Sequence, residues 1–288
     1  MKFLLMLALA LGCLGPACAN QPDLAPASTP RRVVALAPNL AETWAFACGP
    51  EALVGRVNFT DFPPALEALP SVGSALGPDL ERLSLLRPDL VLITRGAAGG
   101  PVATALAGAG LRLEVFQVES PAQVVQAVQR MEQLCNASGL ASQNLIRGFS
   151  EAPGVGAGTP PRVLMLHGHR PLVAAGPGSW GESLLTLAGA TNAVPPTAMP
   201  YPTLSAEDLA ALAPDCILDS SGMYEAPADA QALQLPGHTP LVPLEDSALL
   251  RPGPRFPQAV EAVRRALLQC QPKISLAAPL HTQRSLPL

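Results

Sequence analysis

Aromatic residues are scarce in this chain: 288 residues include two Trp, two Tyr and seven Phe, or 4% of the total. Charged residues are few as well, at 14%, and the formal net charge is −4. The chain therefore lacks the basic surface by which proteins bind nucleic acid. Its 49% hydrophobic residues still indicate a globular protein, long enough for one large core or two of ordinary size.

Several signatures of enzymes are also missing. The sequence contains no Gly-x-Ser-x-Gly elbow and no His-Glu-x-x-His pair. The segment Gly176-Pro177-Gly178-Ser179 is suited to phosphate but lacks the lysine of a P-loop. No Cys-x-x-Cys spacing marks a zinc site or a metal-cluster scaffold. We therefore expect a protein that is not an enzyme and has no catalytic residues.

The N-terminus has the pattern of a targeting segment. Lys2 precedes an apolar run, Phe3 to Leu14, that is too short to span a bilayer. Ala17-Cys18-Ala19 fits a small-x-small cleavage site, so residues 1–19 are predicted to be a signal peptide. Lipoprotein processing at Cys13 or Cys18 is the alternative. Residues 20–30 are expected to be a disordered leader, and residues 271–288 a C-terminal tail.

Four cysteines remain after that cleavage, and four can pair in three ways. Cys48 and Cys135 each end a predicted helix in the first half, while Cys216 and Cys270 lie in the second. An exported chain meets an oxidising compartment, where disulfides persist. The preferred pairing is one bridge in each half, Cys48–Cys135 and Cys216–Cys270.

One stretch of the chain occurs twice. In the first copy Glu81 opens a short amphipathic helix, Pro88-Asp89 stops it, and an apolar strand follows. The second copy repeats this order from Glu207 and stops at Pro214-Asp215. Glutamate and proline are seven residues apart in both copies. The repeat predicts two similar halves.

Strands and helices alternate in both halves, which predicts an α/β fold with mainly parallel sheets flanked by helices. The expected strands span 33–36, 53–57, 90–94, 111–118, 163–166, 216–219 and 241–244. Besides the two glutamate helices, the expected helices span 41–48, 102–109, 122–135, 141–152, 182–189 and 256–270.

These elements divide into an N-terminal lobe at 31–135 and a C-terminal lobe at 162–270. The linker at 136–161 holds one helix and a Gly/Pro-rich stretch that cannot be helical. Two lobes bridged by a single helix leave a cleft between them, lined by loops from the carboxyl ends of the strands. Ligand binding in this cleft is the expected function.

Short motifs in a fixed order carry a family resemblance. They are Pro38-Asn39, Asp61-Phe62-Pro63-Pro64, Leu80-Glu81-Arg82, Pro88-Asp89-Leu90, Ala175-Gly176-Pro177-Gly178-Ser179 and Tyr201-Pro202. From Arg31 to Cys270 the chain resembles the helical-backbone periplasmic substrate-binding proteins of ABC importers. Within that family the cobalamin-binding members are most similar, followed by those that bind haem or iron siderophores.

The resemblance implies a monomeric periplasmic protein that captures a metal chelate and delivers it to the permease of an ABC importer. A corrinoid such as cobalamin is the expected ligand, with haem or a ferric siderophore as the alternative. The protein would touch the membrane only through the permease. A secreted protein that binds a free metal ion is a further alternative, although it needs three or four convergent ligands. A helical bridge implies little closure of the lobes.

The resemblance also implies roles for individual residues. One glutamate on each lobe of the cobalamin-binding members docks onto permease arginines, and the matching positions are Glu81 and Glu207. Both open a helix, where the dipole favours a carboxylate, so the alternative is a helix-start charge without a partner. The positions that match ligand-facing loops are Asn39, Phe59, Leu76, Arg95, Val173, Tyr201 and Arg251, with Trp180 nearby.

Side-chain chemistry refines these roles. Phe59 and Tyr201 offer flat surfaces to a large ring, and Arg251 can reach a phosphate or carboxylate. The tryptophans that flank the corrin in cobalamin-binding members are missing near Ala75 and Thr94. Haem-binding members use a tyrosine ligand, and the first half has no Tyr, so a corrinoid is expected before haem.

A pair of histidines is the one metal-ligand candidate. His167 and His169 follow the expected strand 163–166 and should therefore point into the cleft. A neutral imidazole there could ligate the metal of a bound chelate. The alternative is a hydrogen-bonding loop.

Overall fold

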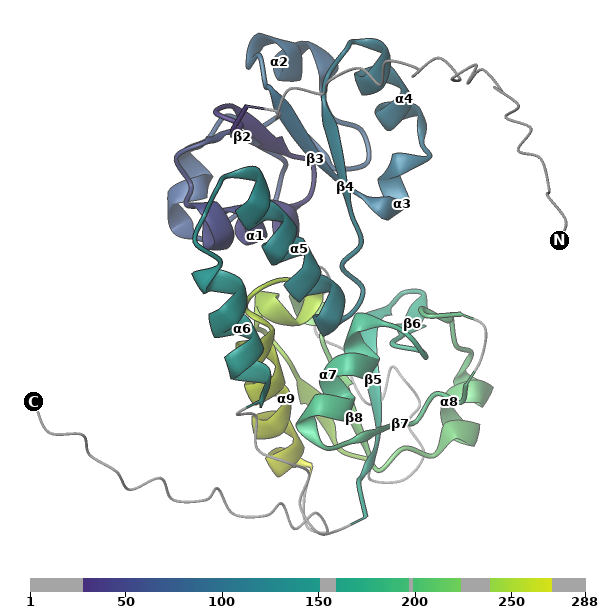
Figure 1. The fold of residues 1–288 in the computed structure, drawn as a ribbon. Coiled ribbons are helices and arrows are strands. Elements are labelled where there is room, and N and C mark those ends of the chain that lie inside the picture. Colours follow the sequence, from purple (N-terminus) through teal and green to yellow (C-terminus); the bar gives the residue numbers. More distant parts are fainter. Residues whose placement is uncertain (1–27, 151–158, 197–198, 224–238, 271–288) are drawn as a thin grey trace, which may run out of the picture.

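The computed structural model describes residues 28–150, 159–196, 199–223 and 239–270. The predicted signal peptide and the C-terminal tail lie outside the described residues. Within them the chain forms two α/β lobes, one above the other in Figure 1. No helix in these ranges is both long and apolar enough to cross a membrane.

The N-terminal lobe contains a four-stranded parallel sheet in the order β2-β1-β3-β4. Its strands are β1 (Val33–Ala35), β2 (Leu53–Arg56), β3 (Leu90–Thr94) and β4 (Leu113–Phe116). Its helices are α1 (Pro38–Cys48), α2 (Leu80–Leu85), α3 (Arg95–Ala98), α4 (Pro101–Gly108) and α5 (Pro121–Leu134), with a 3₁₀ turn η1 (Pro64–Ala68). The two central strands, β1 and β3, are buried along nearly their whole length because helices cover both faces of the sheet.

The C-terminal lobe repeats this plan around its own central strand. Its strands are β5 (Arg162–His169), β6 (Leu172–Ala174), β7 (Thr191–Asn192), β8 (Cys216–Asp219) and β9 (Leu241–Pro243). Its helices are α7 (Trp180–Ala188), α8 (Ala206–Leu212) and α9 (Phe256–Gln269), with 3₁₀ turns η2 (Ser221–Met223) and η3 (Ser247–Leu250). Parallel strands β7 and β8 flank β5, as β2 and β3 flank β1. The prediction of two similar lobes is confirmed.

The repeated Pro-Asp pair has the same structural role in both lobes. Asp89 accepts hydrogen bonds from the backbone N–H groups of Arg31 (2.9 Å) and Arg32 (3.1 Å), just before β1. Asp215 accepts one from the N–H of Arg162 (2.8 Å), at the start of β5. In each lobe the aspartate thus fixes the beginning of the central strand to the end of the glutamate helix.

The C-terminal lobe departs from the expected plan at its central strand. β5 continues through His169, because Leu172–Ala174 turns back and pairs with it in antiparallel register, His169 with Leu172 and Leu166 with Ala174. The prediction that the histidines follow the strand is therefore wrong. They belong to a hairpin that has no counterpart in the N-terminal lobe.

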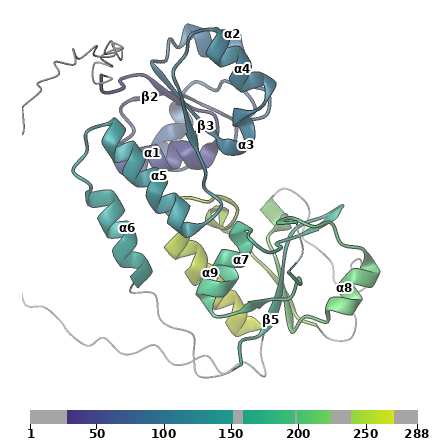
Figure 2. The same cartoon turned by 45° about the vertical axis from the view of Figure 1, so that its right-hand side comes forward.

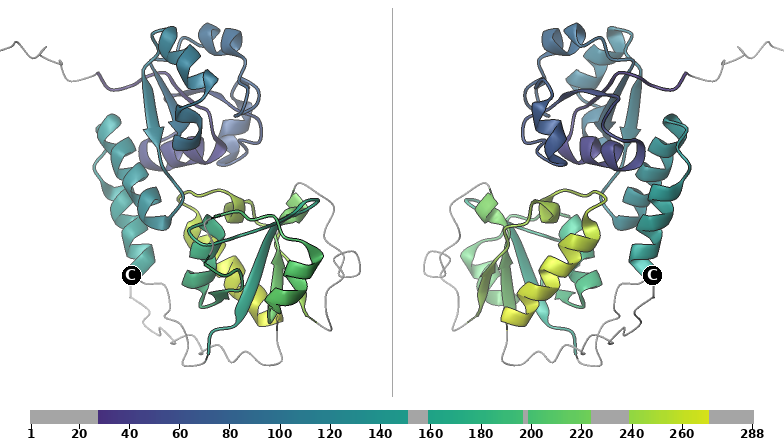
Figure 3. Two further views of the ribbon diagram at one scale, coloured as in Figure 1. Left: turned by 90° about the vertical axis from the view of Figure 1, so that its right-hand side faces the viewer. Right: turned by 90° about the vertical axis from the view of Figure 1, so that its left-hand side faces the viewer.

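Two antiparallel helices run along one side of both lobes, as Figure 2 shows. α5 packs on α1, and α6 (Leu140–Ser150) descends from it toward the C-terminal lobe, where Gly148 lies against Pro257 of α9. Figure 3 shows this helix pair from both sides of the molecule. α6 matches the predicted bridging helix, whose last two residues lie outside the described ranges.

Packing and disulfides secure the ends of these helices. One continuous apolar core includes Trp44 of α1, Met131 of α5, Leu184 of α7 and Val263 of α9, so it extends through both lobes. The Cys48–Cys135 disulfide joins the ends of α1 and α5 (Cα–Cα 6.0 Å). The other joins Cys216, at the start of β8, to Cys270 after α9 (5.7 Å). The predicted pairing is the one in the structure.

Candidate functional site

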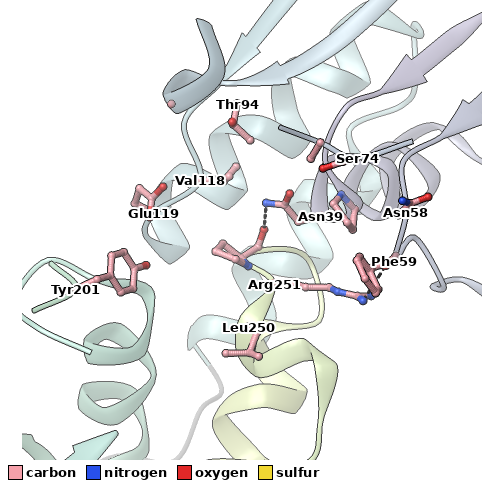
Figure 4. A pocket seen from close by; sticks show the side chains of 14 residues that line it. Asn39, Asn58, Phe59, Ser74, Thr94, Val118, Glu119, Tyr201, Leu250 and Arg251 are labelled. Carbon is pink, nitrogen blue, oxygen red and sulfur yellow. Dashed lines mark hydrogen bonds between the residues drawn. The ribbon is translucent and has the colours of Figure 1, made fainter. Parts of the chain in front are cut away.

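A cleft of about 450 Å³ lies between the lobes, at the carboxyl ends of all four N-terminal strands. This is where ligands bind in open parallel sheets, since each strand there releases a loop. Its walls are formed by Pro38, Asn39, Asn58, Phe59, Ser74, Ala75, Thr94, Gly96, Val118, Glu119, Tyr201, Leu250, Arg251 and Pro252. Figure 4 shows these side chains converging from both lobes.

The floor of the cleft is a direct contact between the lobes. The segment 250–252, which precedes α9, lies against the first turn of α1. The side-chain amide of Asn39 donates a hydrogen bond to the carbonyl oxygen of Pro252 (3.0 Å). Pro38 suits the first helical position, where its missing N–H would have no partner within the helix.

Arg251 connects this floor to the loop that follows β2. Its side chain is 8% exposed, and its guanidinium donates to both carboxylate oxygens of Asp61 and to the carbonyl oxygen of Phe59 (2.8 Å). The hydrogen bonds from Arg251 lower the pKa of the Asp61 carboxyl. The arginine that was expected to bind an anionic group of the ligand is therefore paired with a carboxylate of the opposite lobe.

A second arginine makes a parallel connection. Arg255 donates to both oxygens of Glu42 (2.7 and 2.8 Å), which lies on α1 and is 2% exposed. Its guanidinium also stacks over the ring of Phe62, 4.1 Å from the centroid. Burial raises the pKa of Glu42, and the bonds from Arg255 oppose that rise. The sequence signals for this network were Glu42 inside an apolar helix and two arginines around Pro-Gly-Pro at 252–254.

Across the cleft, Glu119 and Tyr201 face each other from opposite lobes (Figure 4). Burial raises the pKa of Tyr201, and the neighbouring Glu119 carboxylate raises it further. Glu119 takes part in none of the ion pairs between described residues, whereas Arg251 is paired with Asp61. The lining of the cleft thus has one carboxylate and one guanidinium, and the guanidinium is already paired with Asp61.

A smaller cavity of about 290 Å³ adjoins the cleft and shares Tyr201, Leu250 and Pro252 with it. Leu249, His167 and the buried Trp180 complete its lining. The ring of Tyr201 lies 5.8 Å from that of His167. Sequence reasoning gave Trp180 a place near the ligand, and the structure puts it in this side cavity.

The two histidines are held by serines of the neighbouring strand end. His167 Nδ1 lies 3.0 Å from Ser220 Oγ, and His169 Nδ1 lies 3.1 Å from Ser221 Oγ. Burial lowers the pKa of His167 to about 4, so its ring is neutral near pH 7. His169 lines neither cavity. Among the described residues no group of three or more His, Cys, Asp or Glu converges as a metal site.

The structure gathers some of the expected ligand residues and leaves others out. Asn39, Phe59, Tyr201 and Arg251 line the cleft. Leu76, 93% exposed, and Arg95 each directly follow a lining residue without being part of the wall, and Val173 in β6 does not line the cleft either. Sequence reasoning missed Asn58, Ser74, Thr94 and Glu119. Three of these lie at or just after the carboxyl end of a strand, which was the available signal.

The two glutamates of the repeat have equivalent places on the two lobes. Glu81 is the second residue of α2 and Glu207 the second of α8, and both are exposed. Both helices begin at a capping side chain, Asp79 and Ser205 respectively. Their role in docking stays a prediction.

Two α/β lobes, a cleft between them and a helix running from one lobe to the other define a bilobal substrate-binding protein. The structure of "Periplasmic heme-binding protein BhuT in complex with two hemes" is 32% identical in sequence, with a TM-score of 0.70. The match covers 83% of this chain and 98% of that one. The chain belongs to the family of helical-backbone periplasmic substrate-binding proteins of ABC importers.

Other relatives are named for a different ligand, vitamin B12. The vitamin B12-binding protein of Salmonella typhimurium is 27% identical over 242 residues, which are 83% of this chain and 90% of that protein. The vitamin B12-binding protein BtuF of Vibrio cholerae has a TM-score of 0.68 at 22% identity, covering 84% of this chain and 98% of that one, and shows the shared fold. No family model matches the chain.

Proposed function

We propose that the cleft binds a corrinoid such as cobalamin and that the protein delivers it to the permease of an ABC importer. The observation that carries this proposal is the pairing of the charged groups in the cleft. Its one described arginine, Arg251, is paired with Asp61, and Glu119 has no described cation beside it.

The two candidate ligands differ in what they need from such a cleft. A corrin ring is surrounded mainly by neutral amide side chains, whereas haem has two carboxylates. Asn39, Asn58 and Thr94 can exchange hydrogen bonds with amides. A dicarboxylate would instead face Glu119, and juxtaposed like charges weaken binding. The lining thus favours the amide-rich ligand.

The relatives support both ligands to different degrees. The curated relatives are named vitamin B12-binding proteins, which supports a corrinoid. The haem-bound relative has the higher identity, 32%, and makes haem the second candidate. For both, the proposed mechanism is capture between the lobes, followed by docking on the permease through Glu81 and Glu207.

Titration of the purified protein tests the ligand. Aquocobalamin, dicyanocobinamide, haemin and a ferric siderophore would be added separately, with binding followed by calorimetry and by the fluorescence of Trp44 and Trp180. We expect saturable binding of one molecule of either corrinoid, at a lower Kd than haemin. Tighter binding of haemin would reverse the choice of ligand. Binding of none of the four would contradict the transport function itself.

A further inference from the structure

We propose that Arg251 is a positioning residue: it holds the aromatic ring of Phe59 in the wall of the cleft and does not bind an anionic group of the ligand. This inference rests on the proposed function, because it assigns the binding surface for a large planar ring. It concerns the loop 58–62 of one lobe and the segment 250–255 of the other.

Phe59 has an unusual backbone for a residue in a ligand-binding wall. Its φ of 63° lies in the left-handed region, which costs a non-glycine residue roughly 1–2 kcal/mol. Its side chain is 70% exposed, although it lines the cleft. Neither the backbone nor the ring is stabilised by burial, so other contacts must hold this conformation.

Arg251 supplies those contacts from the opposite lobe. One terminal nitrogen donates to the carbonyl oxygen of Phe59 itself (2.8 Å) and to Asp61 Oδ2 (3.0 Å), and the other donates to Asp61 Oδ1. The guanidinium thus holds the loop at two points, Phe59 and Asp61. The planar guanidinium can make these three bonds at once, whereas the ammonium of lysine cannot reproduce their arrangement.

The arginine is itself held in place. Pro252, the next residue, accepts a hydrogen bond from Asn39, and Arg255 is bonded to Glu42 at two points. These contacts fix the segment around Arg251 to α1 of the N-terminal lobe. The orientation of the Phe59 ring therefore depends on how the C-terminal lobe is placed against the N-terminal lobe, and not on its own lobe alone.

A double-mutant cycle between Arg251→Gln and Phe59→Ala tests the proposal. Kd would be measured for aquocobalamin and for dicyanocobinamide, which lacks the phosphate and nucleotide. If Arg251 acts through Phe59, R251Q should weaken both ligands by the same factor, about tenfold. The double variant should bind no more weakly than F59A alone, because the two residues act as one unit.

Two binding outcomes would overturn the proposal. A loss confined to aquocobalamin would mean that Arg251 binds the phosphate. Additive losses in the cycle would mean that Arg251 and Phe59 act independently. Arg82→Gln is the matched control, since Arg82 forms an exposed ion pair with Asp79 away from the cleft, and it should leave both Kd values unchanged.

Hydrogen exchange provides a test that needs no ligand. In R251Q the backbone amides of 58–62 should exchange faster, while those of α2 keep their rates. Unchanged exchange in the loop would contradict the positioning role even if the protein bound neither corrinoid. Failure of the wild-type protein to bind either corrinoid would, in contrast, count against the proposed ligand only.

Discussion

The ionisation of His167 is strongly altered by folding. Burial lowers its pKa from the usual 6.5 to about 4. Between these pH values the unfolded chain takes up a proton that the folded protein does not. The associated stability is therefore complete above about pH 6.5 and is lost as the pH falls toward 4.

Replacing His167 with glutamine should remove that part of the acid sensitivity. From about pH 7.5 to about pH 5 the wild-type protein should lose roughly 2 kcal/mol of unfolding free energy through this residue. His167→Gln should show a smaller loss over the same range in urea unfolding experiments. Equal pH dependence in both proteins would mean that His167 is not buried as a neutral ring.

Glu119 should determine which chelates the cleft rejects. Glu119→Gln removes the negative charge that faces the ligand, so haemin should bind several-fold more tightly, while aquocobalamin binding stays within about twofold. Calorimetric titrations of both ligands measure this. Glu261→Gln, on the exposed surface of α9, is the control and should change neither affinity. Unchanged haemin affinity in the Glu119 variant would contradict the charge argument.

Helix α8 begins with a capping box. Ser205 Oγ accepts a hydrogen bond from the N–H of Asp208 (3.0 Å), and Asp208 accepts one from the N–H of Ser205 (2.8 Å). This reciprocal arrangement satisfies two donors that a helix start otherwise leaves open. It fixes the first turn, in which Glu207 lies.

Ser205→Ala should therefore destabilise the protein by about 1 kcal/mol, as cap removal usually does. The matched control is Ser84→Ala in α2, where the hydroxyl of an exposed serine donates to the carbonyl of Leu80. That change should stay within about 0.5 kcal/mol. Chemical unfolding of both variants gives the comparison, and equal effects would show that the cap of α8 contributes nothing special.

Features that depend on residues close together in the sequence could be predicted, whereas features that depend on residues far apart could not. The Pro-Asp pairs, helix starts and apolar strands are set by neighbouring residues, and both lobes were predicted from them. The extension of β5 depends on pairing with β6, which no periodicity in 163–166 reveals. The pair of Arg251 and Asp61 joins residues 190 positions apart, so its true partner could not be read from either local pattern.

For the whole molecule, the test of delivery is reversal of the two repeated charges. The double variant Glu81→Arg, Glu207→Arg should abolish uptake by cells that depend on this protein, because under the proposed docking like charges would then face each other at the permease. Its Kd for aquocobalamin should equal that of the wild type, since both residues lie outside the cleft. Corrinoid-dependent growth and calorimetry measure the two effects.

The control for this experiment is the same reversal at Glu51 and Glu261, which are exposed elsewhere on the two lobes. These changes should leave uptake intact. A fall in ligand affinity in the Glu81 and Glu207 variant would mean that the charges support the fold or the cleft, and docking would lose its support.

The connectivity of the two disulfides has a consequence for how the protein matures. Cys48 and Cys135 pair with each other, and both precede Cys216 and Cys270 in the sequence. Each bridge therefore closes within one lobe. In a chain exported from its N-terminus and cleaved at the predicted site after Ala19, the first lobe can be oxidised and folded while the second is still crossing the membrane. With Cys13 and Cys18 removed by that cleavage, an oxidase that joins cysteines in their order of emergence would produce both native bridges directly, without an isomerase.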